Sequence, residues 1–372
     1  MTNRPHITPV LVLAGLLAVS STARAVPGNR TEKEEKTTVT AKGKIALVIR
    51  NARGRTVIVG RPEASSVSIT AVKTVVARDG DDARTMMDRI KMDVSEKGDQ
   101  VIIETRDDNK YEDWGWSVMQ VVKGDRRSSW IDYTIEVPIY YRVNAATSSG
   151  EIRISNINGS ADVEATSGDV SLRGVGAGAR VAMTSGDLEA SDIGGDMTVG
   201  ATSGNVKLEN VRGRLDISGT SGDFNVSQVQ KDINVQLTSG DFVLQGCTGD
   251  VVFRSASGDA RMSEVGGGVD ASSSSGDIEV LISPVGARNF DFSSSSGDID
   301  ISYVPAKDYG FHLDVSTNSG SIEGDMPIKV SRVDRRRLQG VVGSGTAKVQ
   351  IQTASGDVSI VEKSDAAVKT SR

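Results

Sequence analysis

The sequence carries one column of oxygen-bearing side chains whose spacing could bind a cation. An acidic or amide residue follows a Ser-Gly pair again and again along the second half of the chain. Stacked carboxylates repel one another by about 1 kcal/mol per solvated pair, and calcium would relieve the repulsion because it prefers oxygen ligands. The members of this acidic column are Glu151, Asp169, Asp187, Asn205, Asp223, Asp241, Asp259, Asp277, Asp298 and Asp357.

A structural role explains the same column without a metal. Each Asp can form an Asx-type turn by accepting hydrogen bonds from nearby backbone N–H groups. The opposite corner of the repeat supplies no second acidic set, and the chain lacks the Gly-Gly-x-Gly-x-Asp run of calcium-binding repeats-in-toxin proteins. We therefore expect structural turns and no cofactor, with calcium as the alternative.

Aromatic residues form a second candidate site. Trp114, Trp116 and Trp130 are the only tryptophans, and they lie in the segment 111–141, which holds seven of the fifteen aromatic residues. Exposed, these rings could stack on sugars or lie at a membrane interface, which makes the tryptophans ligand-binding candidates. Buried, they would plug one end of the repeat region, which is the interpretation we favour. The other four aromatic residues are Tyr111, Tyr133, Tyr140 and Tyr141.

A basic run, Arg332-Val-Asp-Arg-Arg-Arg337, interrupts the repeats. Arg335, Arg336 and Arg337 could contact the phosphates of anionic lipid or lipopolysaccharide. Such a run is also typical of a solvated loop, and we favour the loop.

No residue set indicates catalysis. Cys247 is the only cysteine and should pack as a small apolar residue. Once residues 1–25 are removed, His312 is the only histidine, so no Ser-His-Asp triad or histidine metal cluster can form. β-Helical polysaccharide-degrading enzymes use acidic sites framed by extended loops, whereas these coils are minimal. We predict no catalytic residues, with such an enzyme as the alternative.

A repeat must position these residues. Eight glycines stand at every eighteenth position of one stretch of the chain, and the pattern returns after insertions at Gly297, Gly320 and Gly356. Taking each glycine as position 0, apolar or small residues fall at +2, +4, +7, +11, +13 and usually +15. The eight glycines are Gly150, Gly168, Gly186, Gly204, Gly222, Gly240, Gly258 and Gly276.

The offsets predict strands and corners. Steps of two mark strands with one inward face, and wider steps mark corners. A second glycine often stands at +9, where a corner would need φ > 0 or close backbone approach. We predict that the side chains at +2, +4, +11 and +13 point inward in every coil from Gly150 to Gly276, including those of Ile233 and Val235.

One coil cannot bury its own apolar face, so the coils must stack strand on strand. The sequence predicts an all-β fold: a single-stranded, right-handed parallel β-helix, or β-solenoid, over residues 145–361 with 18-residue coils. The alternative, a left-handed hexapeptide solenoid, requires an apolar residue every six positions, which these offsets lack.

Residues 37–144 predict a β-rich N-terminal cap with one short helix, which would cover the open edge of the solenoid. Residues 44–59 predict two strands around the turn at Asn51-Ala-Arg-Gly54, and residues 90–94 and 133–137 alternate as strands do. Asp81 or Asp82 should cap the helix. Its apolar face would hold Ala83, Met86, Met87 and Ile90.

The N-terminal segment is typical of a signal peptide over residues 1–25. Arg4 precedes the apolar run 10–19, and Ala23-Arg24-Ala25 fits the cleavage pattern. The run is too short for a spanning helix, and no segment of the mature chain could be one. We expect residues 26–36 to be flexible and residues 362–372 to be a disordered tail.

Charge limits the partners. Removing Arg4 and Arg24 takes the net charge from −6 to −8, and this acidity argues against nucleic acid.

The run Val137-Pro138, the segment 147–154 and the Thr-Ser-Gly-Asp series resemble the bacterial "putative adhesin" family, an uncharacterised domain of β-solenoid repeats in envelope proteins. The likeness covers residues 43–360 and implies no shared catalytic motif, so no active-site residues are carried over. It implies an exported, non-catalytic envelope or cell-surface module, adhesin-like or structural, that is periplasmic, at the outer surface or secreted. The partners we expect are envelope polysaccharide, lipid or a surface protein, and the alternative function is a polysaccharide lyase or hydrolase.

Overall fold

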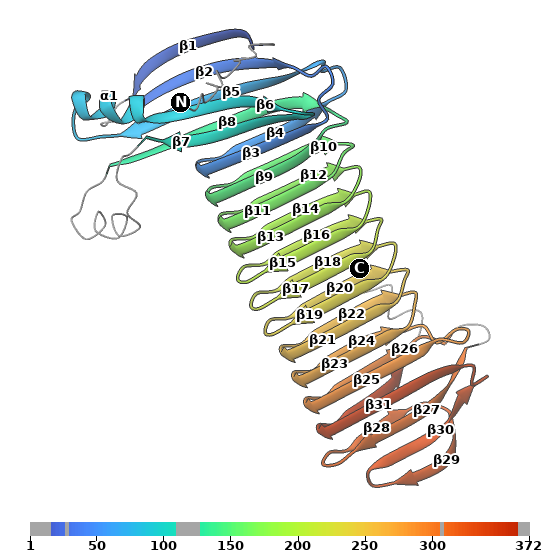
Figure 1. Ribbon diagram of the computed structural model, residues 1–372. Helices are drawn as coiled ribbons and strands as arrows, with labels where there is room; N and C mark the ends of the chain where they lie inside the picture. The colour runs from blue at the N-terminus through green and yellow to red at the C-terminus, as the bar shows by residue number, and fades with distance from the viewer. Residues whose placement is uncertain (1–15, 27–29, 109–126, 306–308, 364–372) are drawn as a thin grey trace, which may run out of the picture. The chain divides into compact units, whose positions relative to one another are not determined.

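The computed structural model describes residues 16–26, 30–108, 127–305 and 309–363 (Figure 1). The chain folds as two compact units, Met1–Tyr141 and Arg142–Arg372. We expected the boundary after residue 144. It falls three residues earlier because the strand β9 starts at Arg142 and already buries Val143.

The first unit is β-rich with a single short helix among its described residues. Its elements are β1 (Leu16–Val26), β2 (Arg30–Thr40), β3 (Ala46–Arg53), β4 (Thr56–Arg61), β5 (Ser66–Val76), α1 (Gly80–Arg89), β6 (Ile90–Lys97), β7 (Gln100–Asp107) and β8 (Ser128–Pro138). Within this unit the strands follow the orders β1-β2-β5-β8-β4 and β3-β7-β6.

The strands β3 and β4 flank the predicted turn but do not form a hairpin. β3 pairs in parallel with β7, and β4 pairs in parallel with β8 in the other sheet. The buried Asn51 side chain fixes this corner, because its Nδ2 donates to the Ile131 carbonyl at 2.9 Å and to Thr56 Oγ1 at 3.2 Å.

The helix α1 begins two or three residues earlier than expected. Its N-cap is Asp79, whose side chain accepts hydrogen bonds from the backbone N–H groups of Asp81 and Asp82. Those two carboxylates lie instead in the first turn, where the helix dipole favours negative charge. Three of the four residues of the predicted apolar face, Ala83, Met86 and Met87, pack against Val75 and Ala77. The fourth, Ile90, is the C-cap and begins β6.

The strand β2 starts at Arg30, inside the segment that we expected to be flexible. Opposite charges alternate along it, and Lys33 pairs with Glu35 at 3.0 Å while Lys36 pairs with Glu34 at 2.7 Å. These ion pairs, together with eleven paired positions against β5, let a polar segment form a strand. β1 pairs antiparallel with β2 and lies almost wholly within the predicted signal peptide, whose removal stays a prediction.

The second unit is the predicted solenoid (Figure 1). One sheet holds β10 (Ile152–Ile157), β12 (Val170–Val175), β14 (Leu188–Ile193), β16 (Val206–Val211), β18 (Phe224–Val229), β20 (Phe242–Cys247), β22 (Ala260–Val265), β24 (Ile278–Ile282), β26 (Ile299–Tyr303), β32 (Val358–Glu362) and β28 (Ile322–Asp325), in that spatial order. The other holds β9 (Arg142–Ser149), β11 (Ala161–Ser167), β13 (Ala179–Ser185), β15 (Met197–Ala201), β17 (Leu215–Gly219), β19 (Ile233–Leu237), β21 (Val251–Ser257), β23 (Val269–Ser275), β25 (Asn289–Ser296), β31 (Ala347–Ser355), β27 (Gly310–Thr317), β30 (Arg337–Gly343) and β29 (Ile328–Asp334).

The coils stack in parallel at the predicted interval. Ile152 lies beside Val170 and Ala161 beside Ala179, and each pair is separated by one repeat of the sequence. Ile233 and Val235 are buried, at 1% and 0% exposure, which confirms the predicted register. The all-β solenoid is therefore confirmed, while its right-handedness stays a prediction.

One part of the inward pattern was wrong. In the coil opened by Gly276, positions +11 and +13 are Ala287 and Asn289, and both are exposed. An insertion moves the inward places to Phe290 and Phe292, at 1% and 0% exposure. This coil is therefore longer than the regular ones, and the next acidic-column bond joins Asp277 to Asp298.

The +9 glycines meet the second of the two expected needs, close backbone approach. At their corner the left-handed residue is at +6, for example Asn210 at φ 57° and Gln228 at φ 58°. A Cβ on Gly213, at +9, would lie 2.3 Å from the Asp196 nitrogen. The position-0 glycines do both: Gly222 has φ +117°, and a Cβ there would lie 2.0 Å from the Gly204 carbonyl oxygen.

The last coils do not stack in sequence order. β31 and β32 pair with β25 and β26 on one side and with β27 and β28 on the other. The coil of Gly356 therefore lies between those of Gly297 and Gly320. β29 and β30 then extend one sheet as an antiparallel hairpin.

Candidate functional site

The acidic column forms a ladder of side-chain to backbone hydrogen bonds. Asp169 Oδ1 accepts from the backbone N–H of Asp187 at 3.0 Å, and Asp187 Oδ1 accepts from that of Asn205 at 2.8 Å. Equivalent bonds join Asn205 to Asp223 and run from Asp241 to Asp357, which accepts from the Ser321 N–H at 2.7 Å. The acceptor role that we expected is present, but the donor belongs to the next coil, so each bond also ties two coils together.

A second ladder runs along the +10 corner. Asp196 Oδ1 accepts from the Arg214 N–H at 2.8 Å. Asp232 and Asp250 accept in the same way from the backbone N–H of the residue one repeat later. Because position +10 holds different residue types in different coils, this ladder was not recognised in the sequence. The recurring Asp at +10 was the signal that could have revealed it.

Neither ladder gathers ligands around one point. Across the described ranges, no group of three or more His, Cys, Asp or Glu residues is placed to hold a metal ion. The predicted lack of a cofactor stays a prediction.

The aromatic candidates are divided. Trp114, Trp116 and Tyr111 lie outside the described residues. Trp130 is partly buried, donates from Nε1 to Asp132 at 3.1 Å and has the Arg30 guanidinium 5.5 Å from its ring centre. This ring is already engaged on both its edge and its face.

The tyrosines of the same segment are divided as well. Tyr133 and Tyr141 are buried, and burial raises the pKa of both phenols. Tyr140 is exposed at 51%. The structure therefore places most of the described aromatic residues in the packing of the first unit.

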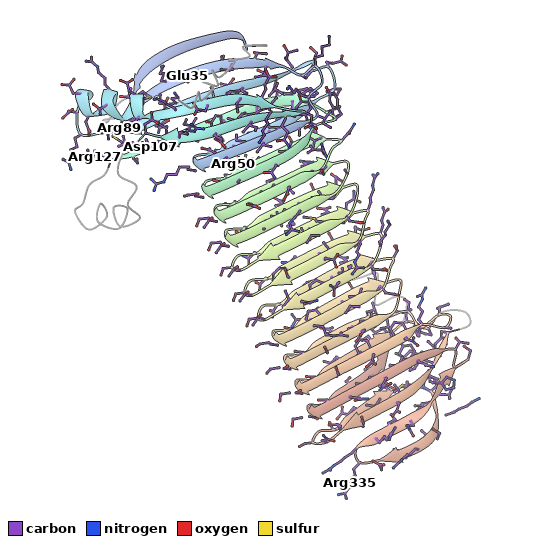
Figure 2. All side chains as sticks on the ribbon, viewed as in Figure 1. Glu35, Arg50, Arg89, Asp107, Arg127 and Arg335 are labelled. Atoms are coloured by element: carbon purple, nitrogen blue, oxygen red, sulfur yellow. The ribbon has the colours of Figure 1, made fainter. Side chains whose placement is uncertain are left out.

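The basic run spans the tip of the β29–β30 hairpin, with the exposed turn at Arg335 and Arg336 between the two strands. Arg337 donates from Nη2 to Asp314 Oδ2 at 2.9 Å, and this pairing lowers the pKa of Asp314 against the raising effect of its partial burial. Arg335 and Arg336 are exposed in the turn, where Figure 2 shows Arg335 at the far end of the hairpin. Of the three candidates, Arg335 and Arg336 remain available to a ligand.

Two single residues, Cys247 and His312, were also considered for chemistry in the sequence. Cys247 is 3% exposed, and burial raises its pKa to about 11, so it is an inert packing residue as predicted. His312 is exposed on β27.

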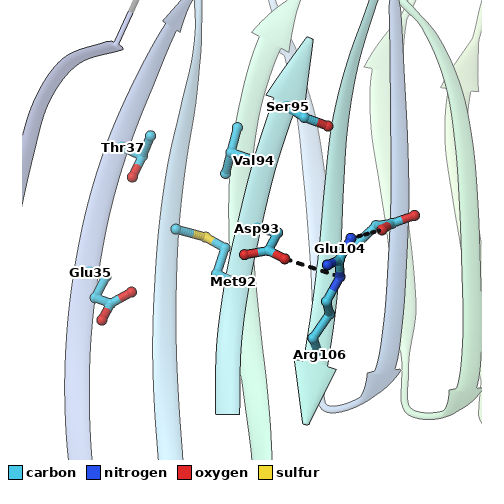
Figure 3. A pocket seen from close by; sticks show the side chains of 8 residues that line it. All are labelled: Glu35, Thr37, Met92, Asp93, Val94, Ser95, Glu104 and Arg106. Atoms are coloured by element: carbon cyan, nitrogen blue, oxygen red, sulfur yellow. Dashed lines mark hydrogen bonds and ion pairs between the residues drawn. The ribbon is translucent and has the colours of Figure 1, made fainter. Parts of the chain in front are cut away.

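A hollow of about 500 Å³ in the first unit escaped the sequence analysis (Figure 3). Strand β2 and the β6–β7 hairpin form it, and β2 is distant from that hairpin in sequence. Glu35 lines it from β2, and its carboxylate lies 3.0 Å from the ammonium of the buried Lys73. The lining residues are Glu35, Thr37, Met92, Asp93, Val94, Ser95, Glu104 and Arg106.

Nearby cations favour the charged form of two carboxylates in this hollow, Glu35 and Glu104. Burial raises the pKa of Glu35, but Lys33 and Lys73 outweigh it and the pKa is lowered. Hydrogen bonds from Arg106 and then Arg50 lower the pKa of Glu104. A glycoside-cleaving pair needs one carboxyl with a raised pKa as the general acid, and neither of these residues supplies it.

The family can now be identified. The family model described as Toastrack DUF4097 matches residues 30–248 and 196–361. The chain belongs to this family. The match spans the strand-rich first unit from β2 onward and nearly the whole solenoid, which confirms the resemblance seen in the sequence.

The solved structures similar to the Toastrack chain include the following two, and no curated protein matches it. One, described as a putative cell adhesion protein from Clostridium sporogenes, is 11% identical, covers 89% of this chain and 100% of its own, and has a TM-score of 0.27. The other, described as a putative adhesin from Bacteroides fragilis, is 13% identical, covers 88% and 96%, and has a TM-score of 0.23. At these TM-scores the likeness carries no argument about function.

Proposed function

We propose that this Toastrack protein is an exported, non-catalytic module of the bacterial cell envelope, with an adhesin-like binding role or a structural one. The observation that carries the proposal is the shortness of the corners. In the coil of Gly222, three residues join β18 to β19 and four join β19 to β20. Corners of this length cannot build the walls of a substrate cleft.

The side chains support the same proposal. Carboxylates of the acidic column, such as Asp169, accept hydrogen bonds from the next coil. The three carboxylates of the first-unit hollow, Glu35, Asp93 and Glu104, are paired with cations. Among the described residues, no helix is long and apolar enough to span a membrane. Export rests on the N-terminal pattern of residues 1–25, and the expected place is the periplasm, the outer surface or the medium.

Two measurements test this proposal. Cell fractionation with N-terminal mass analysis should find the chain outside the cytoplasm and starting at Val26. A binding screen of the purified chain against envelope glycans, lipids and surface proteins, run beside a glycan-cleavage assay, should find binding without cleavage. Release of new reducing ends or unsaturated sugars would instead identify a polysaccharide hydrolase or lyase.

A further inference from the structure

The apolar inner face of the solenoid continues beyond its last coil. β28 is the last strand of one sheet, while the other sheet continues past β27 to β30 and β29. Val315 lies beside Leu338, and Leu338 beside Val333, so these three side chains point to the same face. Their burial falls along the row, from 0% exposure at Val315 to 69% at Val333.

A second row repeats the pattern. Leu313 lies beside Gly340, and Gly340 beside Val330. Leu313 is 3% exposed, whereas Val330 is 49% exposed. Two strands thus carry a core-facing apolar surface past the point where the opposite sheet ends, and its valines lie open.

A hollow of about 540 Å³ lies beside this surface. Ile322, Val333 and Leu338 give it an apolar lining, and the turn at Asn318–Ser321 forms one wall. Arg335 and Arg336 line it as well. In the part of the chain that the structure describes, no carboxylate lies within ion-pair distance of these two side chains, whereas Arg337 and Arg332 pair with Asp314 and Asp334.

The hollow is lined by two arginines, Arg335 and Arg336, and by one carboxylate, Asp334, which pairs with Arg332. The acidic column stops at Asp357, and the last coil has Ser321 in its place. Exposed valines beside unpaired arginines match a surface with both apolar and anionic chemistry. A soluble polysaccharide offers no comparable apolar partner for the valines.

A second copy of the chain fits this end of the solenoid less well than a surface with apolar and anionic chemistry does. β29 is an edge strand that could accept another strand, but its register shifts between Val330 and Arg332. Bulges and basic residues on an edge strand oppose strand addition.

We propose that the β29–β30 hairpin docks on the anionic surface of a lipid bilayer, with Val330 and Val333 inserting between headgroups and Arg335 and Arg336 contacting lipid phosphates. The proposal rests on the proposed envelope role only for its location. Binding is measured on purified protein, so a failure of export and a failure of lipid binding are separate results.

The test is co-sedimentation of the purified chain with phosphatidylcholine vesicles that contain or lack phosphatidylglycerol. Wild-type protein should bind the anionic vesicles and release them as salt is raised. The double substitution Arg335→Gln, Arg336→Gln should weaken binding roughly 30-fold, from about 1 kcal/mol per cation near an anionic surface. Val330→Ser with Val333→Ser should weaken it as well, at unchanged charge.

The matched control is Arg212→Gln with Lys231→Gln, which removes two exposed cations from the corners of the regular coils. This variant should bind like wild type, and all variants should keep the wild-type melting transition. Since Arg335 and Arg336 are exposed, their substitution tests binding even if the valine variant does not fold.

Three results would overturn the proposal. Equal binding to neutral and anionic vesicles would remove the role of the arginines. Competition by inorganic phosphate, with loss of binding, would assign an isolated anion site instead of a bilayer surface. A dimer in sedimentation velocity that Val330→Ser, Val333→Ser dissolves would assign the valines to a second copy.

Discussion

In the regular coils opened by Gly150 through Gly258, each strand pairs with the equivalent strand of the coil that follows it in the sequence. In the C-terminal coils the same kind of parallel pairing skips over intervening segments, as with Phe290 and Val349 or Phe311 and Ala347. The two regions share their turn sequence and their inward pattern. The repeat therefore determines the shape of a coil but not its place in the stack.

The largest effect should follow removal of the intercalated coil by ending the chain at Ser344. β27 and β28 would then lose their parallel partners, together with the packing of the fully buried Val349, Ile351, Val358 and Ile360. At about 1.5–3 kcal/mol per buried side chain, the loss is on the order of 10 kcal/mol. Hydrogen exchange should show residues 310–343 unprotected and the regular coils unchanged. Retained protection of residues 310–343 would mean that β27 can dock directly on β25.

Within the regular coils, Val235→Asp should cost about 3–5 kcal/mol, because the new carboxylate would be an unpaired charge in an apolar core. The Val235 side chain is fully buried. Urea unfolding followed by circular dichroism measures the loss. The adjacent Gln236 is exposed, so Gln236→Asp is the control and should stay within about 0.5 kcal/mol of wild type. Equal effects of the two substitutions would contradict the inward register.

A smaller effect of opposite sign is expected at the C-terminal end. Partial burial raises the pKa of Asp300, and Glu279, Asp298 and Asp277 raise it further. A folded-state pKa above the unfolded one penalises the charged form, so Asp300→Asn should raise the melting temperature slightly at neutral pH. The gain should disappear as the pH falls below the ordinary value of 3.8, since Asp300 is then neutral in both states.

Glu189 offers the matched control for this carboxylate. It occupies the same +3 position in a regular coil, and its carboxylate lies 4.0 Å from the Lys207 ammonium. Glu189→Gln should therefore bring no gain at neutral pH. A pH-independent gain from Asp300→Asn would show that charge is not the cause.

The smallest effect is expected from calcium. The ladder carboxylates already accept backbone hydrogen bonds, so melts with calcium and with chelator should nearly coincide. Calcium at a hundredfold excess over its Kd would stabilise the fold by about 2.7 kcal/mol. A reversible rise of several degrees with millimolar calcium would count against the structural role of the ladder.

The regular coils could be predicted from the sequence because every determinant is local. Val235 is inward because it stands at position +13 of the coil that Gly222 opens, and the stack repeats that relation. The corner at +6 was missed because Asn210 and Gln228 are not glycines, although they have left-handed backbones. Side-chain type signals such a position only weakly.

The rest depends on contacts between distant segments. Nothing near Gly356 in the sequence indicates that its coil precedes that of Gly320 in space. The first-unit hollow likewise depends on distant strands, since Glu35 of β2 and Arg106 of β7 both line it. The charged composition of β2 did not indicate a strand. Of the candidate residues, Arg335 and Arg336 are exposed as a ligand contact requires, but the hollow between them and β28 was visible only in the structure.

The intercalated coil has a consequence for biosynthesis. A ribosome makes β27 and β28 before β31 and β32, so the outermost strands emerge when only β25 and β26 are available as partners. Regular coils can add one at a time as they emerge, whereas the last ones must wait or form a wrong pairing that later has to open. Refolding should therefore include a slow step confined to residues after Tyr303, and the nascent chain is most exposed to misassembly after β28 has emerged and before β31 and β32 have.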